Sequence, residues 1–162
     1  MTDLRAAGLR AKVLTVSDGV IAGVREDRSG EALEELLVGA GYDVVERRAV
    51  ADGTESVAGT LSDMTDGFTG LVVTTGGTGF GPRDLTPEGT RQIVERLAPG
   101  LAEAMRLVNP LGRLSRAVAG TRGRALILNT PGSPRGAVEC TEAVLDVLPH
   151  ALRLLSDEPT PH

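Results

Sequence analysis

The chain of 162 residues has very few aromatic side chains. Aromatic residues make up 2% of the sequence and hydrophobic residues 41%, so aliphatic side chains must fill the core. A protein that binds single-stranded nucleic acid by base stacking needs more aromatic platforms than this. The net charge of −5 also lacks the positive balance that phosphate backbones attract. We therefore expect no nucleic-acid partner.

Cysteine and long apolar runs are also nearly absent. Cys140 is the only cysteine, which excludes a disulfide within the chain and a metal site made of several cysteines. No segment approaches the ~18 consecutive apolar residues of a membrane-spanning helix, and residues 1–10 contain no apolar core of a signal peptide. We expect a cytoplasmic protein without a membrane partner.

Strand and helix patterns alternate along the chain. Strands are expected near 12–16, 42–50, 71–75 and 125–129, a short ribbon over 116–123, and helices near 29–38, 55–64, 86–97, 99–108 and 133–155. Repeated strand–helix units predict an α/β fold with three layers, α/β/α, and a mostly parallel central sheet. The length fits a single domain, expected over 10–155, with flexible ends at 1–9 and 156–162.

The most distinctive segment covers 71–88 and has the sequence LVVTTGGTGFGPRDLTPE. It begins as an apolar strand, continues as a glycine-rich loop and ends at a helix start. Residues without a Cβ let such a loop adopt positive φ and turn its N–H groups towards an anion; here they are Gly76, Gly77, Gly79 and Gly81. Thr78 adds a hydroxyl, Arg83 a fork of donors, and Asp84 a carboxylate suited to magnesium. Together they indicate phosphate chemistry.

The loop matches neither of the two common phosphate-binding patterns. A Walker A loop is excluded because no Gly-Lys-Ser/Thr follows, and Lys12 is the only lysine. The pattern G-x-G-x-x-G fails because Pro82 occupies the last glycine position. As a generic glycine loop, the segment is equally compatible with a structural turn.

Polar residues also follow the other predicted parallel strands. Ser17 and Asp18 follow the first strand, Asp52 follows the second, and Pro131, Gly132 and Ser133 follow the last. Ligands of doubly wound sheets bind beyond the carboxyl ends of the strands. These residues and the glycine loop are therefore expected to form one composite pocket.

Each of these residues also has a purely structural explanation. Helix capping accounts for Asp52, Ser29 and Ser133. Thr86 is expected to cap the next helix, with Pro87 at its first position, and Asp84 would interact favourably with the dipole of that helix. Asp18 and Gly19 fit a simple turn.

The remaining reactive side chains exclude several mechanisms. Two histidines near the C-terminus make a Ser-His-Asp triad hard to assemble, and a single lysine within a strand disfavours a Schiff base. Cys140 and His150 fall on the last predicted helix, where packing explains them best. Aspartate, arginine and backbone N–H groups remain, and these suit metal-assisted phosphoryl or nucleotidyl transfer.

Six motifs in order resemble one known family. They are Val16-Ser-Asp-Gly19, Asp27-Arg-Ser-Gly30, Thr74 to Glu88, Leu114-Ser-Arg116, Gly120-Thr-Arg-Gly123 and Asn129-Thr-Pro-Gly-Ser133. The chain resembles the Mog/MoaB family of molybdenum cofactor biosynthesis proteins and the G domain of gephyrin, over about Arg10 to Leu155. The resemblance implies a molybdopterin adenylyltransferase, which makes adenylyl-molybdopterin and pyrophosphate from ATP with Mg²⁺.

The resemblance also implies roles for individual residues. Asp52 and Asp84 match the two acids tied to catalysis and Mg²⁺, and Gly76, Gly77, Thr78 and Gly79 would hold the ATP phosphates. The nucleotide and pterin pocket would include Ser17, Asp18, Ser115, Arg116, Pro131, Gly132 and Ser133. By analogy the protein would be a homotrimer that hands its product to a molybdate-inserting enzyme.

Two departures from the family pattern affect local rigidity. Asp52 stands in an Ala-Asp-Gly context where Pro-Asp-Glu is usual, and Gly89 stands where alanine is common, which should weaken the helix start by ~1 kcal/mol. A non-catalytic relative that binds molybdopterin without using ATP is an alternative, since a shared fold does not secure a shared reaction. A trimeric scaffold is a further alternative, for which the short chain offers little linker material.

Overall fold

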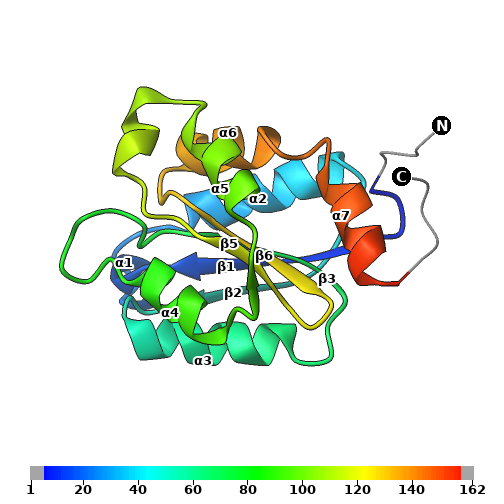
Figure 1. Cartoon of the computed structure of the whole chain (residues 1–162). Helices are drawn as coiled ribbons and strands as arrows, with labels where there is room; N and C mark the ends of the chain where they lie inside the picture. The colour runs from blue at the N-terminus through cyan, green and yellow to red at the C-terminus, as the bar shows by residue number, and fades with distance from the viewer. Residues whose placement is uncertain (1–5, 158–162) are drawn as a thin grey trace.

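A single mixed sheet forms the centre of the computed structural model, which describes residues 6–157 (Figure 1). Its strands lie in the order Asp43–Val50 (β2), Arg10–Val16 (β1), Gly70–Thr75 (β3), Ala125–Thr130 (β6), Ala119–Arg122 (β5) and Arg96–Leu97 (β4). The strands β2, β1, β3 and β6 are parallel to one another, whereas β5 is antiparallel to both of its neighbours, β6 and β4. The predicted mostly parallel sheet is confirmed, and its parallel strands end at the same edge.

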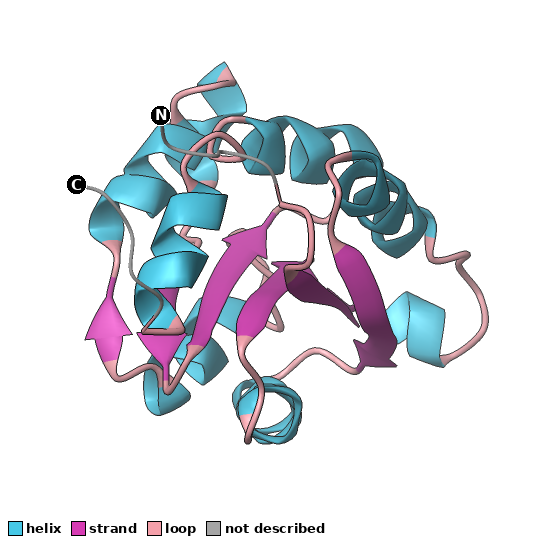
Figure 2. Ribbon diagram, turned by 90° about the vertical axis from the view of Figure 1, so that its right-hand side faces the viewer, coloured by secondary structure: helices cyan, strands magenta, loops and turns pink. Residues whose placement is uncertain are grey.

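Helices cover both faces of the sheet (Figures 1 and 2). One face carries Thr54–Thr65 (α3) and Thr86–Ile93 (α4), and the other carries Arg28–Gly39 (α2), Pro99–Arg106 (α5), Pro134–Glu142 (α6) and Leu148–Leu155 (α7). Asp18–Ile21 (α1) and the 3-10 helix Pro110–Leu114 (η1) lie at the carboxyl edge of the sheet. The three-layer architecture is therefore confirmed. Within 6–157, no helix has the length and apolarity needed to cross a membrane.

The two central strands explain why the apolar runs of the sequence are continuous. Every residue of β3 and β6 is buried, as expected for parallel strands with helices on both faces. Leu71 and Leu128 face the larger core under α2 and α5–α7, while Val72 and Ile127 face the smaller core over α3. This rigid centre positions the loops at the carboxyl edge.

Gly89 has a packing function that its sequence context does not reveal. A Cβ at this position would lie 2.7 Å from Thr54 O and from Val57 Cβ, both on α3. Such contacts are shorter than van der Waals distances, so α4 can approach α3 this closely only with glycine. The glycine that is expected to weaken the start of α4 thus also permits a close contact between α3 and α4.

Several predicted helices end earlier than expected. The helix expected over 86–97 ends at Ile93, because Arg96–Leu97 leaves the helical layer and pairs with β5 at the sheet edge. The long helix expected at 133–155 is divided into α6 and α7, and Pro149 lies in the first turn of α7, where proline is tolerated. The four-residue helix α1 replaces the simple turn expected at Asp18 and Gly19.

Candidate functional site

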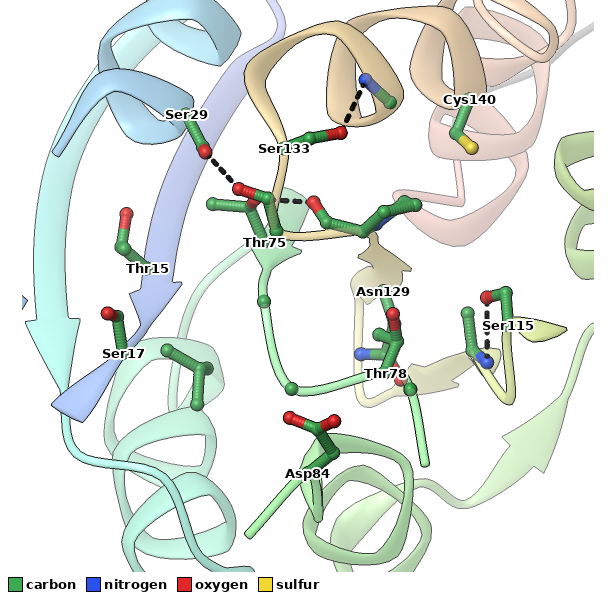
Figure 3. Close-up of a pocket in the computed structure, with 18 of the residues that line it drawn as sticks. Thr15, Ser17, Ser29, Thr75, Thr78, Asp84, Ser115, Asn129, Ser133 and Cys140 are labelled. Carbon is green, nitrogen blue, oxygen red and sulfur yellow. Dashed lines mark hydrogen bonds between the residues drawn. The ribbon is translucent and has the colours of Figure 1, made fainter. Parts of the chain in front are cut away.

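A cavity of about 750 Å³ lies beyond the carboxyl ends of β1, β3 and β6 (Figure 3). Its lining includes eleven of the thirteen site residues expected from the sequence, namely Ser17, Asp52, Gly76, Gly77, Thr78, Gly79, Asp84, Ser115, Pro131, Gly132 and Ser133. The other two, Asp18 and Arg116, stand outside the lining, where both support the loops around the cavity. The polar strand ends therefore converge on one pocket.

At two positions of the glycine loop after β3, the backbone has a conformation that favours glycine and leaves no space for a Cβ. Gly76 and Gly77 have φ values of +103° and +69°. A Cβ on Gly76 would collide with Val16 O, and one on Gly77 with Thr86 Oγ1. The loop thus lies against the end of β1 and the start of α4, with no space for a Cβ at these two positions.

Thr86 fastens this loop instead of capping α4. The N-cap position of α4 is Leu85, which makes no side-chain capping bond. Thr86 Oγ1 donates a hydrogen bond to Gly76 O at 2.9 Å, and Thr86 N donates to Gly77 O at 3.1 Å. The capping prediction was wrong because the hydroxyl has a partner across the loop.

A buried polar network beneath the loop ties β3, β6 and α4 together. The amide Nδ2 of Asn129 donates to Thr74 Oγ1 and to Thr90 Oγ1, each at 3.0 Å, while its Oδ1 accepts from Val118 N at 3.1 Å. Thr130 Oγ1 donates to Thr74 O at 2.7 Å. Fully satisfied buried networks of this kind hold one unique arrangement, so the floor of the cavity is rigid.

Asp52 is bound to Asp18 rather than to the helix that follows it. Gly53 occupies the N-cap position of α3 and no side chain caps this helix, so the capping prediction for Asp52 was wrong. Asp18 N donates to Asp52 Oδ2 at 2.9 Å, and Asp52 N donates to Asp18 Oδ1 at 3.1 Å. This reciprocal pair joins the ends of β1 and β2.

Arg83 stabilises this pair of acids from the far end of the glycine loop. Its guanidinium donates to both oxygens of Asp18, with Nε to Oδ2 at 2.6 Å and Nη2 to Oδ1 at 3.1 Å. This hydrogen-bonded ion pair lowers the pKa of Asp18 and raises that of Arg83. Asp18 is therefore held as a carboxylate.

Asp84 also lies beside the glycine loop, with its carboxylate directed towards the glycines (Figure 3). Its Oδ2 accepts from Gly81 N at 2.8 Å. Asp84 therefore closes the loop over residues 81–84, in addition to standing just before α4. The expected interaction with the helix dipole does not account for this contact.

Arg116 supports the same loop from behind. Arg116 Nε donates to Gly79 O at 2.8 Å, Arg116 N donates to Thr78 O at 2.9 Å, and the guanidinium also bonds Asp84 O. The guanidinium pairs with Glu88 at 2.7 Å, and this hydrogen bond lowers the pKa of Glu88 and raises that of Arg116. These groups are thus engaged with protein.

Two of the acids that line the cavity, Asp52 and Asp84, fit a magnesium ion shared with phosphates. No cluster of three or more His, Cys, Asp or Glu side chains suited to a metal occurs within residues 6–157. Mg²⁺ needs only one or two carboxylates when waters and substrate phosphates complete its six ligands. Asp52 Oδ1 lies 3.3 Å, and Asp84 Oδ2 3.1 Å, from where a Cβ on Gly77 and Gly79, respectively, would stand. Both carboxylates thus lie next to the loop.

The wall opposite the glycine loop comes from the start of α2. Asp27, not Ser29, is the N-cap of this helix, because Asp27 Oδ1 accepts from Gly30 N at 3.0 Å. Ser29 lies inside the helix, and its hydroxyl donates to Gly132 O. Thr15 Oγ1 also donates to Asp27 Oδ1, at 2.8 Å. These bonds join α2 to β1 and to the loop before α6.

Ser133 is the N-cap of α6, as the sequence predicted. Its hydroxyl accepts from Gly136 N at 3.0 Å, and the residue also lines the cavity (Figure 3). Capping and pocket lining are therefore compatible here. Thr75 Oγ1 donates to Pro131 O at 2.7 Å and fixes the same loop against β3.

The sequence did not reveal the outer wall formed by the end of α5, η1 and α6. This wall contains Met105, Arg106, Asn109, Leu111, Gly112, Leu114, Arg135, Glu139 and Cys140. Cys140 is half-buried, and burial raises the pKa of its thiol, so the thiol is not an activated nucleophile. His150 lies outside the cavity lining, on α7. The only sequence signal for this wall was the Leu114-Ser-Arg116 motif.

Fold and site together define the class of protein. It is an open α/β protein whose cavity lies beyond the parallel strand ends, with a glycine loop and carboxylates in its lining. Residues 12–150 match the family described as "Probable molybdopterin binding domain". The chain belongs to this family of molybdenum cofactor biosynthesis proteins, as the motif resemblance indicated.

Individual relatives cover most of the chain. A molybdopterin adenylyltransferase of Helicobacter pylori is 40% identical over 150 residues, which is 88% of this chain and 85% of the relative. The molybdopterin adenylyltransferase of Escherichia coli is 39% identical over 145 residues, covering 85% of this chain and 74% of the relative. The crystal structure of the molybdopterin biosynthesis enzyme MoaB from Thermus thermophilus superposes with a TM-score of 0.87 at 47% identity, covering 94% of this chain and 99% of that one.

Proposed function

We propose that this protein is a molybdopterin adenylyltransferase that transfers the adenylyl group of ATP to the terminal phosphate of molybdopterin with Mg²⁺. The observation that carries the proposal is that Asp52 and Asp84 both lie next to the glycine loop in one cavity. The names of the relatives and their identity of about 40% over most of the chain support the same activity.

The reaction is a substitution at phosphorus. An oxygen of the terminal phosphate of molybdopterin forms a bond to the α-phosphorus of ATP, and the bond from that phosphorus to the bridging oxygen breaks. Pyrophosphate leaves with the bonding electrons, and adenylyl-molybdopterin remains. The protein contributes mainly by positioning the groups and neutralising their charge.

The residues of the cavity would divide this work between two regions. Gly76, Gly77, Thr78 and Gly79 would hold the ATP phosphates, since all four line the cavity and three of them have no side chain. The N–H of Gly76 donates to Thr130 O at 3.1 Å, so the N–H donors to phosphate would come from residues 77–79. Asp52 and Asp84 would hold Mg²⁺, which neutralises charge on the phosphates. Ser17, Ser115, Pro131, Gly132 and Ser133 would line the nucleotide and pterin pocket.

We also propose the wider setting of the reaction. Residues 10–155 would form a single domain in a cytoplasmic homotrimer that hands its product to a molybdate-inserting enzyme. Of the expected flexible ends, 1–5 and 158–162 lie outside the described residues. Ala6, by contrast, is 2% exposed and packs in the larger core.

The experiment that tests the function is release of pyrophosphate from Mg·ATP with and without molybdopterin. Wild-type protein should release pyrophosphate only when the pterin is present, and Asp52→Ala and Asp84→Asn should abolish the release. Binding of the pterin without any release of pyrophosphate would instead establish a non-catalytic molybdopterin-binding protein.

A further inference from the structure

The sequence suggested Arg83 as a ligand for phosphate, but in the structure its guanidinium donates to three acceptor atoms on two residues of the protein. Besides both oxygens of Asp18, the group donates from Nη2 to Asp52 O at 2.8 Å. Arg83 does not belong to the cavity lining. A guanidinium has five N–H donors in a fixed plane, and here this fork is turned towards the strand ends rather than towards the cavity.

Asp18, Asp52 and Arg83 are joined by hydrogen bonds into one closed arrangement. Asp18 Oδ1 accepts from both Asp52 N and Arg83 Nη2, and Asp18 Oδ2 accepts from Arg83 Nε. Asp52 Oδ2 is held by Asp18 N. The two acids follow different strands, and like charges this close repel each other unless a cation compensates for them. Arg83 supplies that cation.

This arrangement decides which oxygen of Asp52 faces the glycine loop. Because Oδ2 is bound by Asp18 N, Oδ1 is directed at Gly77, 3.3 Å from where a Cβ on that glycine would stand. Among the hydrogen bonds of residues 6–157, none engages Asp52 Oδ1. The free oxygen therefore faces the loop that would hold phosphates.

We propose that Arg83 is a positioning residue that orients Asp52 through Asp18 and Asp52 O, and not a ligand of the ATP phosphates. The inference rests on the proposed adenylyl transfer. The ion pair is exposed, with 63% of the Arg83 side chain and 45% of the Asp18 side chain accessible to solvent. Exposed ion pairs add little to stability, so the effect of Arg83 should be on turnover rather than on folding.

The test separates turnover from ATP affinity in Arg83→Met. Loss of orientation at a reacting centre lowers turnover by up to about 100-fold, so we expect a lower kcat at saturating Mg·ATP, with an unchanged Kd for ATP measured without Mg²⁺ and an unchanged melting temperature. Arg83→Lys should recover only part of the kcat, since an ammonium cannot bond both oxygens of Asp18 in the same plane. Arg48→Met is the matched control, because Arg48 is a partly exposed arginine on β2 with only a weak 3.9 Å ion pair.

Two further measurements make the result specific. In an Asp18→Asn background, Arg83→Met should reduce kcat less than it does in the wild type, because both changes remove the same arrangement. A crystal structure of Arg83→Met should show Asp52 Oδ1 turned away from Gly77.

The inference is overturned if Arg83→Met weakens ATP binding while kcat is retained, or if Asp52 keeps its orientation in that variant. A wild-type protein that releases no pyrophosphate would contradict the proposed function instead. The crystal structure of the variant still decides whether Arg83 orients Asp52.

Discussion

The two ends of the parallel strands are built from different chemistry. At the amino ends, apolar side chains close the sheet: Tyr42 and Phe68 are 4% and 5% exposed, and the Phe68 ring packs against the Lys12 ammonium at 4.2 Å. At the carboxyl ends, glycines, hydroxyls, two arginines and four aspartates form hydrogen bonds around a cavity. We therefore expect changes at the amino edge to act mainly on stability, and changes in the cavity lining to act mainly on function.

The largest expected effect is at the carboxyl edge. Asp84→Asn keeps the size of the side chain and one accepting oxygen but removes the charge that Mg²⁺ requires, so turnover should fall by about 100-fold or more. Because Asp84 lies on the cavity, the melting temperature and pterin binding should change little. Steady-state kinetics and thermal denaturation measure both, and near-normal turnover would exclude Asp84 from the metal site.

The second-largest effect is expected in the larger core, on stability rather than on turnover. Leu37 on α2 is fully buried and its carbonyl accepts from Tyr42 N at 3.0 Å. Leu37→Ala should lower the free energy of unfolding by about 2–5 kcal/mol, as measured by urea denaturation. Folded variant protein should retain the wild-type Kd for ATP. A large change in that Kd would show that the two edges are coupled.

A third change, at Gly77, should affect both stability and ATP binding. Gly77 has φ of +69° and no space for a Cβ beside Thr86 Oγ1. Gly77→Ala should cost at least the ~1–2 kcal/mol of a left-handed alanine and also weaken ATP binding. The matched control is Gly123→Ala, where φ is +57° but nothing lies within 4 Å of the new Cβ. Equal losses in both variants would mean that the close approach at Gly77 is unimportant.

The smallest effect concerns the only tyrosine of the chain. Burial raises the pKa of Tyr42 to about 12, and the chain has no tryptophan to obscure the absorbance of its phenolate. Since the folded pKa is raised, the stabilising contribution of the neutral phenol is complete below about pH 10, the unfolded value. It is lost as pH rises through 12. An absorbance titration of the folded protein with a midpoint near 10 would contradict burial of this side chain.

The sequence predicted the convergence of the site because strand ends are local features. An apolar run followed by polar or glycine residues marks the carboxyl end of a strand, and parallel strands bring such ends together. Asp52, Asp84 and the glycine loop were found in this way, and their motif order indicated the family.

The partners of the charged residues could not be predicted, because they are distant in sequence. Arg83 and Asp18 are 65 positions apart, and Arg116 and Glu88 are 28 apart. Both arginines were expected near substrate, but their tertiary contacts place both outside the cavity lining. The capping residue of α2 was misassigned for a related reason: Asp27 and Ser29 are both suitable caps, and only the contact of Ser29 with Gly132 distinguishes them.

The most direct test of the site is a crystal structure of the protein with Mg²⁺ and a non-hydrolysable ATP analogue. The proposed function predicts phosphate oxygens at the backbone N–H groups of residues 77–79, since Gly76 N already donates to Thr130 O, and a magnesium ion bound by Asp52 Oδ1 and the Asp84 carboxylate, with Arg83 still paired to Asp18. A nucleotide bound elsewhere, or phosphates bound by Arg83 with Asp52 turned away, would contradict this account of the carboxyl edge.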